Sequence, residues 1–390
     1  MNEEQFFNDF DAHRWDLTIV DEEDENHPVL QIGLVATFYL TDGYLPVRRK
    51  HIAKAFELYC KYYGEHLVWG YTGGEEMIKK SFSNHAMRDC IDYIESDGLT
   101  ESAAFRWSSL GGFEHASSYM FGAYSPAGWF EQVHQSITIV RLYLPINELK
   151  GAGKQNFETL IFSLCNILRP LHGAAGLGIQ HSYEWENYQH IEYELIQEYR
   201  GVDLCSPSGN KKWRTGYTNL NWYTYLAHHW VSKLGTTEDL LTQLDDVRIG
   251  VLPYEWGTIF RAGNWPALGK ATIDPRPELY VMVNEVLKPL RVNNIGSLHY
   301  GSIAGEIRLN ERTSNQWMRR FDLPKDSPKP KPSPFFRRVS MEEQQRLDAS
   351  KQMFDAFLNR NSDDKSNNSQ ANRQRFLLDT LDALSAAIGT

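Results

Sequence analysis

Hydrophobic residues near the start of the chain follow first a strand pattern and then a helix pattern. Residues 29–40 form a long β-prone run that is bounded by Pro28 and by Asp42-Gly43. The helix that begins at Pro46 has apolar residues at relative positions 0, 3, 4, 7, 8 and 11, which is the spacing of one helical face. Residues 67–69 then predict a returning strand. The apolar face of this first helix comprises Ile52, Ala55, Phe56, Tyr59, Cys60 and Tyr63.

The same pattern returns further along the chain. Residues 136–144 predict a strand, residues 157–168 predict a helix with identical spacing, and residues 174–179 predict a second strand. A third apolar stripe occupies residues 279–290, and the second and third helices end in Leu-Arg-Pro-Leu and Leu-Lys-Pro-Leu. This shared order and shared proline indicate an internal αβ pseudo-repeat. We therefore expect an α+β fold with mixed or antiparallel sheets. It has two related lobes, at residues 29–200 and 201–323, and each lobe is a sheet with helices packed on it.

Other segments of the two lobes have weaker patterns. Residues 182–200, 222–234 and 278–290 predict helices, whereas residues 247–252 and 258–260 predict strands. Residues 73–80 and 90–95 are helix-like. Glycines between Gly111 and Gly128 predict a loop-rich connection.

The composition changes after residue 323. Residues 324–334 contain five prolines and three lysines, which is typical of an extended linker, and we assign residues 324–339 to it. Residues 340–390 begin with a capping-box sequence at Ser340 and have two apolar stripes separated by a polar tract. They predict a helical C-terminal appendage, a hairpin outside the main domain at residues 29–323. Two short helices bury too little to be stable alone, so we expect the hairpin to pack on another surface.

The formal net charge of −10 is concentrated at the N-terminus. Residues 1–26 hold ten acidic residues against one basic residue, Arg14, and the rest of the chain is nearly neutral. We treat residues 1–28 as an acidic N-terminal segment. Such a segment repels nucleic-acid phosphates and attracts a basic partner, although a charge run is more often a solvated tail. The densest part of the run is Asp21, Glu22, Glu23, Asp24 and Glu25.

The spacing of the four cysteines and the lack of long apolar stretches predict the cellular compartment. Cys60, Cys90, Cys165 and Cys205 lie far apart, which argues against a zinc site or a disulfide framework and favours a reducing compartment. The N-terminus lacks the pattern of a secretory signal, and no stretch has the apolar length of a membrane span. These features predict a cytoplasmic protein that has no membrane partner.

Motifs for catalysis or cofactor binding are missing from the sequence. His190 and Glu194 have the spacing of two zinc ligands but lack a third, so a surface ion pair is the better interpretation. Glu148-Leu149-Lys150 has the form of a metal-dependent nuclease motif but lacks the upstream aspartate that would share the metal. The His228-His229 pair lies in a predicted helix, where we expect one of the two to be a partnered core residue. We therefore predict no enzyme activity, no cofactor, no metal and no nucleic-acid partner.

Aromatic residues are dense between Trp213 and Trp265. Tyr254, Glu255 and Trp256 fall at the predicted turn between two strands, where side chains usually face solvent. Aromatic rings beside a carboxylate at a loop tip are typical of a protein-binding hot spot. These three residues and the acidic run are the first candidates for a partner surface, and the glycine-rich segment 111–128 is the next.

Three stretches have a distinctive apolar, aromatic and glycine-rich sequence: Leu168-Arg169-Pro170-Leu171-His172-Gly173-Ala174-Ala175-Gly176-Leu177-Gly178, Asn219-Leu220-Asn221-Trp222-Tyr223-Thr224-Tyr225-Leu226 and Arg261-Ala262-Gly263-Asn264-Trp265-Pro266. Together they resemble the type VI secretion immunity family TsiV, long catalogued as a domain of unknown function. The resemblance covers residues 29–291, and its signatures are apolar, aromatic and glycine-rich rather than catalytic. It implies an acidic residue at position 270, where this chain has Lys270.

The resemblance implies a cytoplasmic immunity protein that binds and neutralises a cognate type VI toxin, with nucleases as the toxins of several members. Neutralisation would be stoichiometric, by occlusion of the toxin's active or substrate-binding site, without turnover. Two alternatives remain open. An effector chaperone or adaptor would leave toxin activity intact, and an unrecognised hydrolase would have a polar pocket with perturbed titratable groups. The sequence makes no prediction about self-association.

Overall fold

The structure is a computed structural model that describes residues 1–20, 27–73, 80–110, 114–182, 187–204, 210–302 and 305–328, with short stretches between residues 330 and 352. The chain forms two compact units, Met1–Lys331 and Pro332–Thr390. The sheet and the contacts described below belong to the first unit. Most of the predicted C-terminal hairpin lies outside the described residues, so it stays a prediction.

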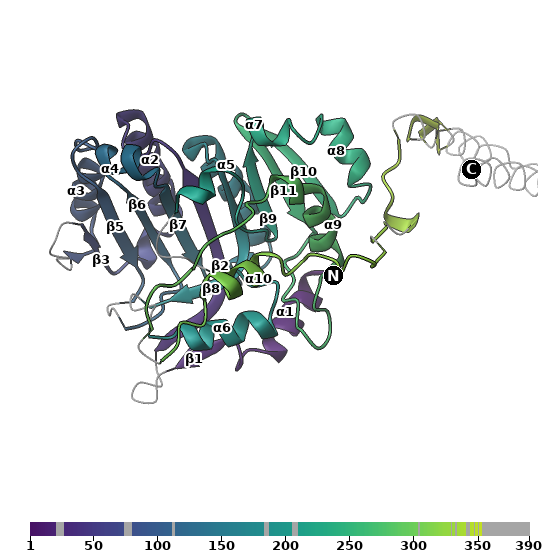
Figure 1. Cartoon of the computed structure of the whole chain (residues 1–390), viewed down its shortest axis with the longest axis horizontal. Coiled ribbons are helices and arrows are strands. Elements are labelled where there is room, and N and C mark those ends of the chain that lie inside the picture. Colours follow the sequence, from purple (N-terminus) through teal and green to yellow (C-terminus); the bar gives the residue numbers. More distant parts are fainter. Residues whose placement is uncertain are drawn as a thin grey trace, which may run out of the picture. The chain divides into compact units, whose positions relative to one another are not determined.

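One antiparallel sheet of 11 strands forms the centre of the first unit (Figure 1). Ten strands follow the order β10-β11-β9-β8-β2-β7-β6-β5-β3-β4, and β1 pairs with β2. In the central strand β2, Leu34 lies opposite both Leu144 of β7 and Leu177 of β8. The strands are β1 Thr18–Val20, β2 Pro28–Leu40, β3 Trp69–Thr72, β4 Lys80–Ser81, β5 Ala103–Ser108, β6 Met120–Ser125, β7 Thr138–Leu144, β8 His172–His181, β9 Tyr223–Ala227, β10 Ile249–Tyr254 and β11 Gly257–Ala262.

Helices pack on this sheet through the apolar stripes that the sequence predicts. The stripe of α2 is buried except for the half-buried Cys60, and all six stripe residues of α5 are buried. These contacts confirm the α+β class. No helix in the described ranges is both long and apolar enough to cross a membrane. The helices are α1 Glu3–Ala12, α2 Pro46–Tyr63, α3 Asn84–Ile94, α4 Gly128–His134, α5 Gly153–Leu168, α6 Gln189–Glu198, α7 His228–Val231, α8 Thr237–Gln243, α9 Glu278–Leu287 and α10 Glu311–Met318.

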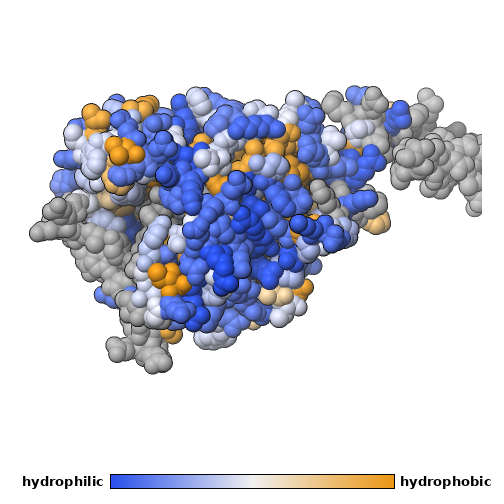
Figure 2. Space-filling model, in the orientation of Figure 1, coloured by the Kyte–Doolittle hydropathy of each residue, from blue (hydrophilic) through white to orange (hydrophobic). Residues whose placement is uncertain are grey.

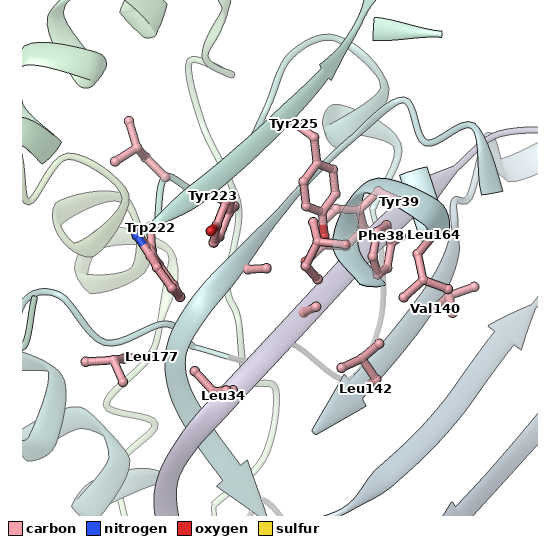
Figure 3. Packing of buried hydrophobic residues seen from close by; sticks show 14 of the residues in the cluster. Leu34, Phe38, Tyr39, Val140, Leu142, Leu164, Leu177, Trp222, Tyr223 and Tyr225 are labelled. Atoms are coloured by element: carbon pink, nitrogen blue, oxygen red, sulfur yellow. The ribbon is translucent and has the colours of Figure 1, made fainter. Parts of the chain in front are cut away.

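The core beneath α5 joins β9 to the centre of the sheet through Tyr225 (Figure 3). The Tyr225 ring stacks on Phe38 of β2 at a centroid distance of 4.8 Å. Its hydroxyl lies 2.6 Å from the carbonyl oxygen of Thr37 and 3.0 Å from that of Ala174. Gly173 provides the room, because a Cβ there would lie 2.1 Å from a Tyr225 ring atom. The glycine of the Leu-His-Gly sequence is therefore needed for close approach of the ring.

Two expectations about the second predicted lobe are wrong. The strands of both lobes join one sheet instead of forming a sheet each, because β8 pairs directly with β9. Residues 222–234 do not form one helix: strand β9 takes the first half, and only His228–Val231 are helical, as α7. Tyr223, Thr224 and Tyr225 have high strand propensity, and β8 and β11 supply hydrogen bonds on both sides of β9. The residue bounds of the lobes remain a prediction.

The N-terminal segment is anchored over residues 1–20, so a solvated tail is the wrong interpretation for this part of it. Phe6 of α1 is buried and stacks on Trp265 at 5.2 Å. The carboxylate of Asp16 accepts a hydrogen bond from the Tyr199 hydroxyl at 2.8 Å. Lys270, where the family resemblance implies an acid, lies 3.2 Å from Nδ1 of His13 and so helps to hold this segment.

Candidate functional site

The predicted partner-binding turn is the tip of the β10–β11 hairpin. Tyr254 pairs with Gly257, so Glu255 and Trp256 are the two residues of the turn. Both side chains reach the surface, and Trp256 is 37% exposed. The ring of Trp256 lies 3.9 Å from the guanidinium carbon of Arg169, a cation–π contact. Glu255 and Trp256 are therefore placed as expected.

Tyr254 is not at the surface, and the expectation that it faces solvent is wrong. It is 5% exposed and packs edge-on against Phe162 of α5. Burial raises the pKa of its hydroxyl well above the usual value. Because a two-residue turn leaves position 254 inside the strand, side-chain alternation directs the tyrosine towards α5. Tyr254 supports the turn from within.

The surroundings of Trp256 are basic. Arg169 follows the last residue of α5 in a left-handed conformation, with φ of 51°. Arg48 of α2 donates to the carbonyls of Leu168 and Arg169 at 3.1 and 3.3 Å. Burial, and then the charges of Arg169 and Arg48, lower the pKa of His51. A basic partner is repelled by these groups, so Glu255 does not make this turn an acidic surface.

The acidic run Asp21, Glu22, Glu23, Asp24 and Glu25 lies outside the described residues. The residues on either side of it are held in place. Val20 pairs with Pro28 at the end of the β1–β2 ladder, and the His27 ring stacks on His115 at 4.5 Å. The role of the run in binding stays a prediction.

The histidines of the two sequence motifs differ from expectation in their contacts and burial. In the described residues, His190 and Glu194 do not form the predicted ion pair. His228 and His229 are both exposed, and Trp230 and Val231 are the buried residues of α7. The His228 ring is 3.1 Å from the carbonyl oxygen of Glu255, so it contacts the turn and not the core.

A buried cluster of His181, Glu192 and His299 was not predicted. The Glu192 carboxylate of α6 lies 3.1 Å from Nε2 of His181 on β8 and 2.9 Å from Nε2 of His299. Burial alone raises the pKa of Glu192, but the two histidines outweigh burial and lower it to about 2. Burial lowers the pKa of His181. The cluster ties α6 and the segment around residue 299 to the sheet.

This cluster has no access for a substrate. All three side chains are at most 2% exposed. Within the described ranges, no group of three or more His, Cys, Asp or Glu side chains is arranged to hold a metal ion. Glu148 of the Glu-Leu-Lys sequence accepts a hydrogen bond from the Tyr119 hydroxyl at 2.6 Å. The charged groups named here link elements of the fold.

A cavity of about 240 Å³ lies on the face of β3, β5, β6 and β7. Its polar wall includes Arg106 and Arg141, whose guanidinium groups are engaged by the protein. Arg106 donates to the carbonyl of His181 at 3.0 Å, and Arg141 donates to the hydroxyl of Thr37 at 3.2 Å. The hollow is lined by Tyr71, Ala104, Phe105, Arg106, Met120, Gly122, Ala123, Tyr124, Ile139, Arg141 and Tyr143.

The sequence of residues 51–321 matches the TsiV family, described as type VI immunity for VRR-NUC. This match spans most of the first unit. The chain belongs to the TsiV family. No functionally curated protein has a matching sequence. A solved structure, the Pseudomonas aeruginosa type VI secretion protein PA0821, has a similar fold, with a TM-score of 0.71 and 22% identity. The alignment covers 83% of this chain and 92% of PA0821.

For a TsiV protein, the relevant site is a surface that binds a toxin, and sequence patterns locate such a surface poorly. The buried cluster has no local signature, because His181, Glu192 and His299 come from three separate segments. Alternation along β10 is the signal that could have placed Tyr254 inside: Tyr254 shares a face of the strand with Leu252, which packs against the core, whereas Pro253 between them is exposed.

Proposed function

We propose that this TsiV protein binds a VRR-NUC nuclease toxin of type VI secretion and neutralises it by stoichiometric occlusion of its active or substrate-binding site. The observation that carries the proposal is the family match over residues 51–321. The protein acts as a binding partner, so its surface and not a catalytic pocket performs the function. The cognate toxin is its partner, and no cofactor takes part.

The position of the perturbed titratable groups supports binding over catalysis. An enzyme uses perturbed groups where substrate reaches them. Here, the carboxylates of Glu192 and Asp203 are 0% and 3% exposed. The pKa of Glu192 is lowered to about 2 by its two histidines, and burial raises that of Asp203 to about 7. Both groups lie inside the domain, which disfavours the hydrolase alternative.

Competition with nucleic acid gives a physical route to neutralisation. A nuclease binds its substrate through basic groups that contact phosphates. A protein surface that carries carboxylates can occupy the same groups and exclude the substrate. Two groups of residues are proposed as such contacts: the run of acids at residues 21–25, and Glu255 with Trp256. The basic neighbours of Trp256 act against binding of a basic groove by Glu255 and Trp256.

A titration of nuclease activity tests the proposal. The toxin domain cleaves a fluorescent DNA duplex at fixed concentration, and the protein is added in increments. We expect activity to fall linearly to zero at one equivalent when the toxin concentration is far above Kd. A chaperone or adaptor predicts a stable complex that still cleaves DNA. An enzyme that inactivates the toxin predicts complete loss of activity at far below one equivalent.

A further inference from the structure

An exposed apolar surface lies beside α4, at the end of the unit opposite β10. It consists of Leu99, Trp129 and Val133, which we call the α4 patch. Their exposed fractions are 54%, 57% and 72%. Figure 2 shows hydrophobic side chains gathered over the region where α2, α3 and α4 lie. Three large apolar side chains in one place are an interaction surface more often than isolated ones.

The α4 patch is held rigidly from behind. The backbone N–H of Trp129 donates to the carbonyl of Leu99 at 3.3 Å, and that of Gly128 donates to Gly98 at 2.9 Å. On the inner side of α4, the buried Glu131 accepts hydrogen bonds from the backbone of Asp42 at 2.5 Å. Because Glu131 fixes the inner side, Trp129 and Val133 remain on the outer side. A partner therefore need not order this backbone on binding.

Exposed carboxylates precede and follow Leu99 of this patch along the chain. Asp92, Glu95, Asp97 and Glu101 are all exposed, on α3 and on the segment on either side of Leu99. The Asp97 carboxylate accepts hydrogen bonds from the Leu99 backbone and from the Thr100 hydroxyl, both at 2.9 Å. These hydrogen bonds lower its pKa, so Asp97 stays ionised beside the apolar surface. Asp89 is left out of this acidic rim because it is 3.3 Å from His85.

The backbone that carries the acidic rim is also fixed. Arg49 of α2 is buried, and its guanidinium donates to the carbonyl of Ile94 at 3.4 Å and to that of Glu101 at 2.9 Å. The Arg49 guanidinium thus points into the protein, below the rim, while the carboxylates face solvent. A second cation, Arg214, is paired with the buried Glu131 of α4 at 2.5 Å. This arrangement contrasts with the turn at Trp256, whose neighbours are basic.

We infer that the α4 patch with its acidic rim is the surface that docks on the basic, phosphate-binding groove of the nuclease toxin. This inference rests on the proposed function and places the interface at the α4 patch instead of at the Glu255–Trp256 turn, whose neighbours are basic. The apolar centre supplies the buried anchor, and the carboxylates occupy positions that substrate phosphates otherwise take. Trp129 is the expected hot spot, since tryptophan at the centre of an interface contributes more binding energy than its neighbours.

The test measures association and dissociation with a catalytically inactive toxin at low and at physiological salt. Trp129→Ala removes the anchor, and Trp15→Ala is its matched control, since Trp15 is 91% exposed on the N-terminal segment. We expect Trp129→Ala to speed dissociation about tenfold or more and Trp15→Ala to leave it unchanged. Val133→Arg, at a more exposed position, places a cation opposite the basic groove and should weaken binding as well.

Charge is tested by a second pair of variants. Asp92→Asn, Glu95→Gln and Glu101→Gln together neutralise the rim and leave the Asp97 turn intact. We expect association to slow about tenfold at low salt, with the difference shrinking as salt rises. The control neutralises three exposed glutamates on three other helices and should leave association unchanged. These are Glu57, Glu194 and Glu238.

The outcomes separate the inference from the proposed function. If the wild-type protein inhibits the toxin but Trp129→Ala, Val133→Arg and the rim variant bind with wild-type rates, the interface lies elsewhere and only the inference fails. If Trp15→Ala weakens binding while Trp129→Ala does not, the N-terminal segment is the interface. If the wild-type protein neither binds nor inhibits a cognate toxin, both fail. Equal melting temperatures of all variants exclude misfolding as the cause.

Discussion

Glu192 and His299 meet in the interior of the domain, with 2.9 Å between a carboxylate oxygen and Nε2. Both side chains are at most 1% exposed, and the other carboxylate oxygen lies 3.1 Å from His181. A buried charge is tolerated only when such partners satisfy it. The contact is therefore part of what fixes α6 and the segment around residue 299 on the sheet.

Removing this carboxylate should destabilise the protein strongly. We expect Glu192→Ala to lower the free energy of unfolding by about 3 kcal/mol or more, because it leaves two buried histidines without their acceptor. Glu194→Ala on the same helix is the control. Its side chain is exposed, so a change within about 0.5 kcal/mol is expected. Urea unfolding measures both values, and similar losses in the two variants would contradict the assigned role.

His172 should make stability depend on pH. Burial lowers its pKa from 6.5 to about 3, while its contact with the Trp213 carbonyl acts in the opposite direction. Between these values the unfolded chain binds more protons than the folded chain, so stability falls as the pH falls. The slope contributed by this group is at most about 1.4 kcal/mol per pH unit.

The measurement compares urea unfolding between pH 7 and pH 4. Glu192 and His181 also make stability fall as the pH falls. The decisive comparison is therefore between His172→Gln and wild type, and not the absolute slope. His172→Gln should flatten the curve relative to wild type. His85→Gln should not, because the His85 side chain is 86% exposed. Identical slopes for wild type and His172→Gln would rule out a neutral, buried His172.

Asp203 should make stability depend on pH in the opposite direction. Burial raises its pKa from 3.8 to about 7, against the opposing charges of Arg320 and Arg141. Between these values the folded chain binds the extra proton, so this group lowers stability as the pH rises. Asp203→Asn removes the dependence. Its stability relative to wild type should increase from pH 4 to pH 8, and a pH-independent difference would show that Asp203 is ionised throughout.

Helices were predicted well where the periodic spacing of apolar residues was the main signal. The stripes of α2 and α5 matched the structure because burial on one face imposes a single spacing on a long helix. The signal failed around β9, where Trp222, Tyr225 and Leu226 have the spacing of one helical face. The pairing with β8 and β11 decides the strand, and those partners are distant in sequence.

The candidate surface could be predicted only in part. Glu255 and Trp256 do form a turn, but no pattern in the sequence predicts that Arg169 lies against Trp256 or that Arg48 donates to the Arg169 carbonyl. The α4 patch combines residues from α4 with Leu99, which come together through the Trp129–Leu99 backbone hydrogen bond. The glycine-rich segment between Gly111 and Gly128 was the next candidate for a partner surface, and α4 begins at its last glycine.

The central claim is that this TsiV protein excludes substrate from a VRR-NUC nuclease by occupying the same surface. The most direct measurement is the fluorescence anisotropy of labelled DNA bound to a catalytically inactive toxin while the protein is added. The account predicts that anisotropy falls to the value of free DNA at one equivalent of protein per toxin, because protein and DNA compete for one groove. A further rise in anisotropy, from a ternary complex of DNA, toxin and protein, would contradict it.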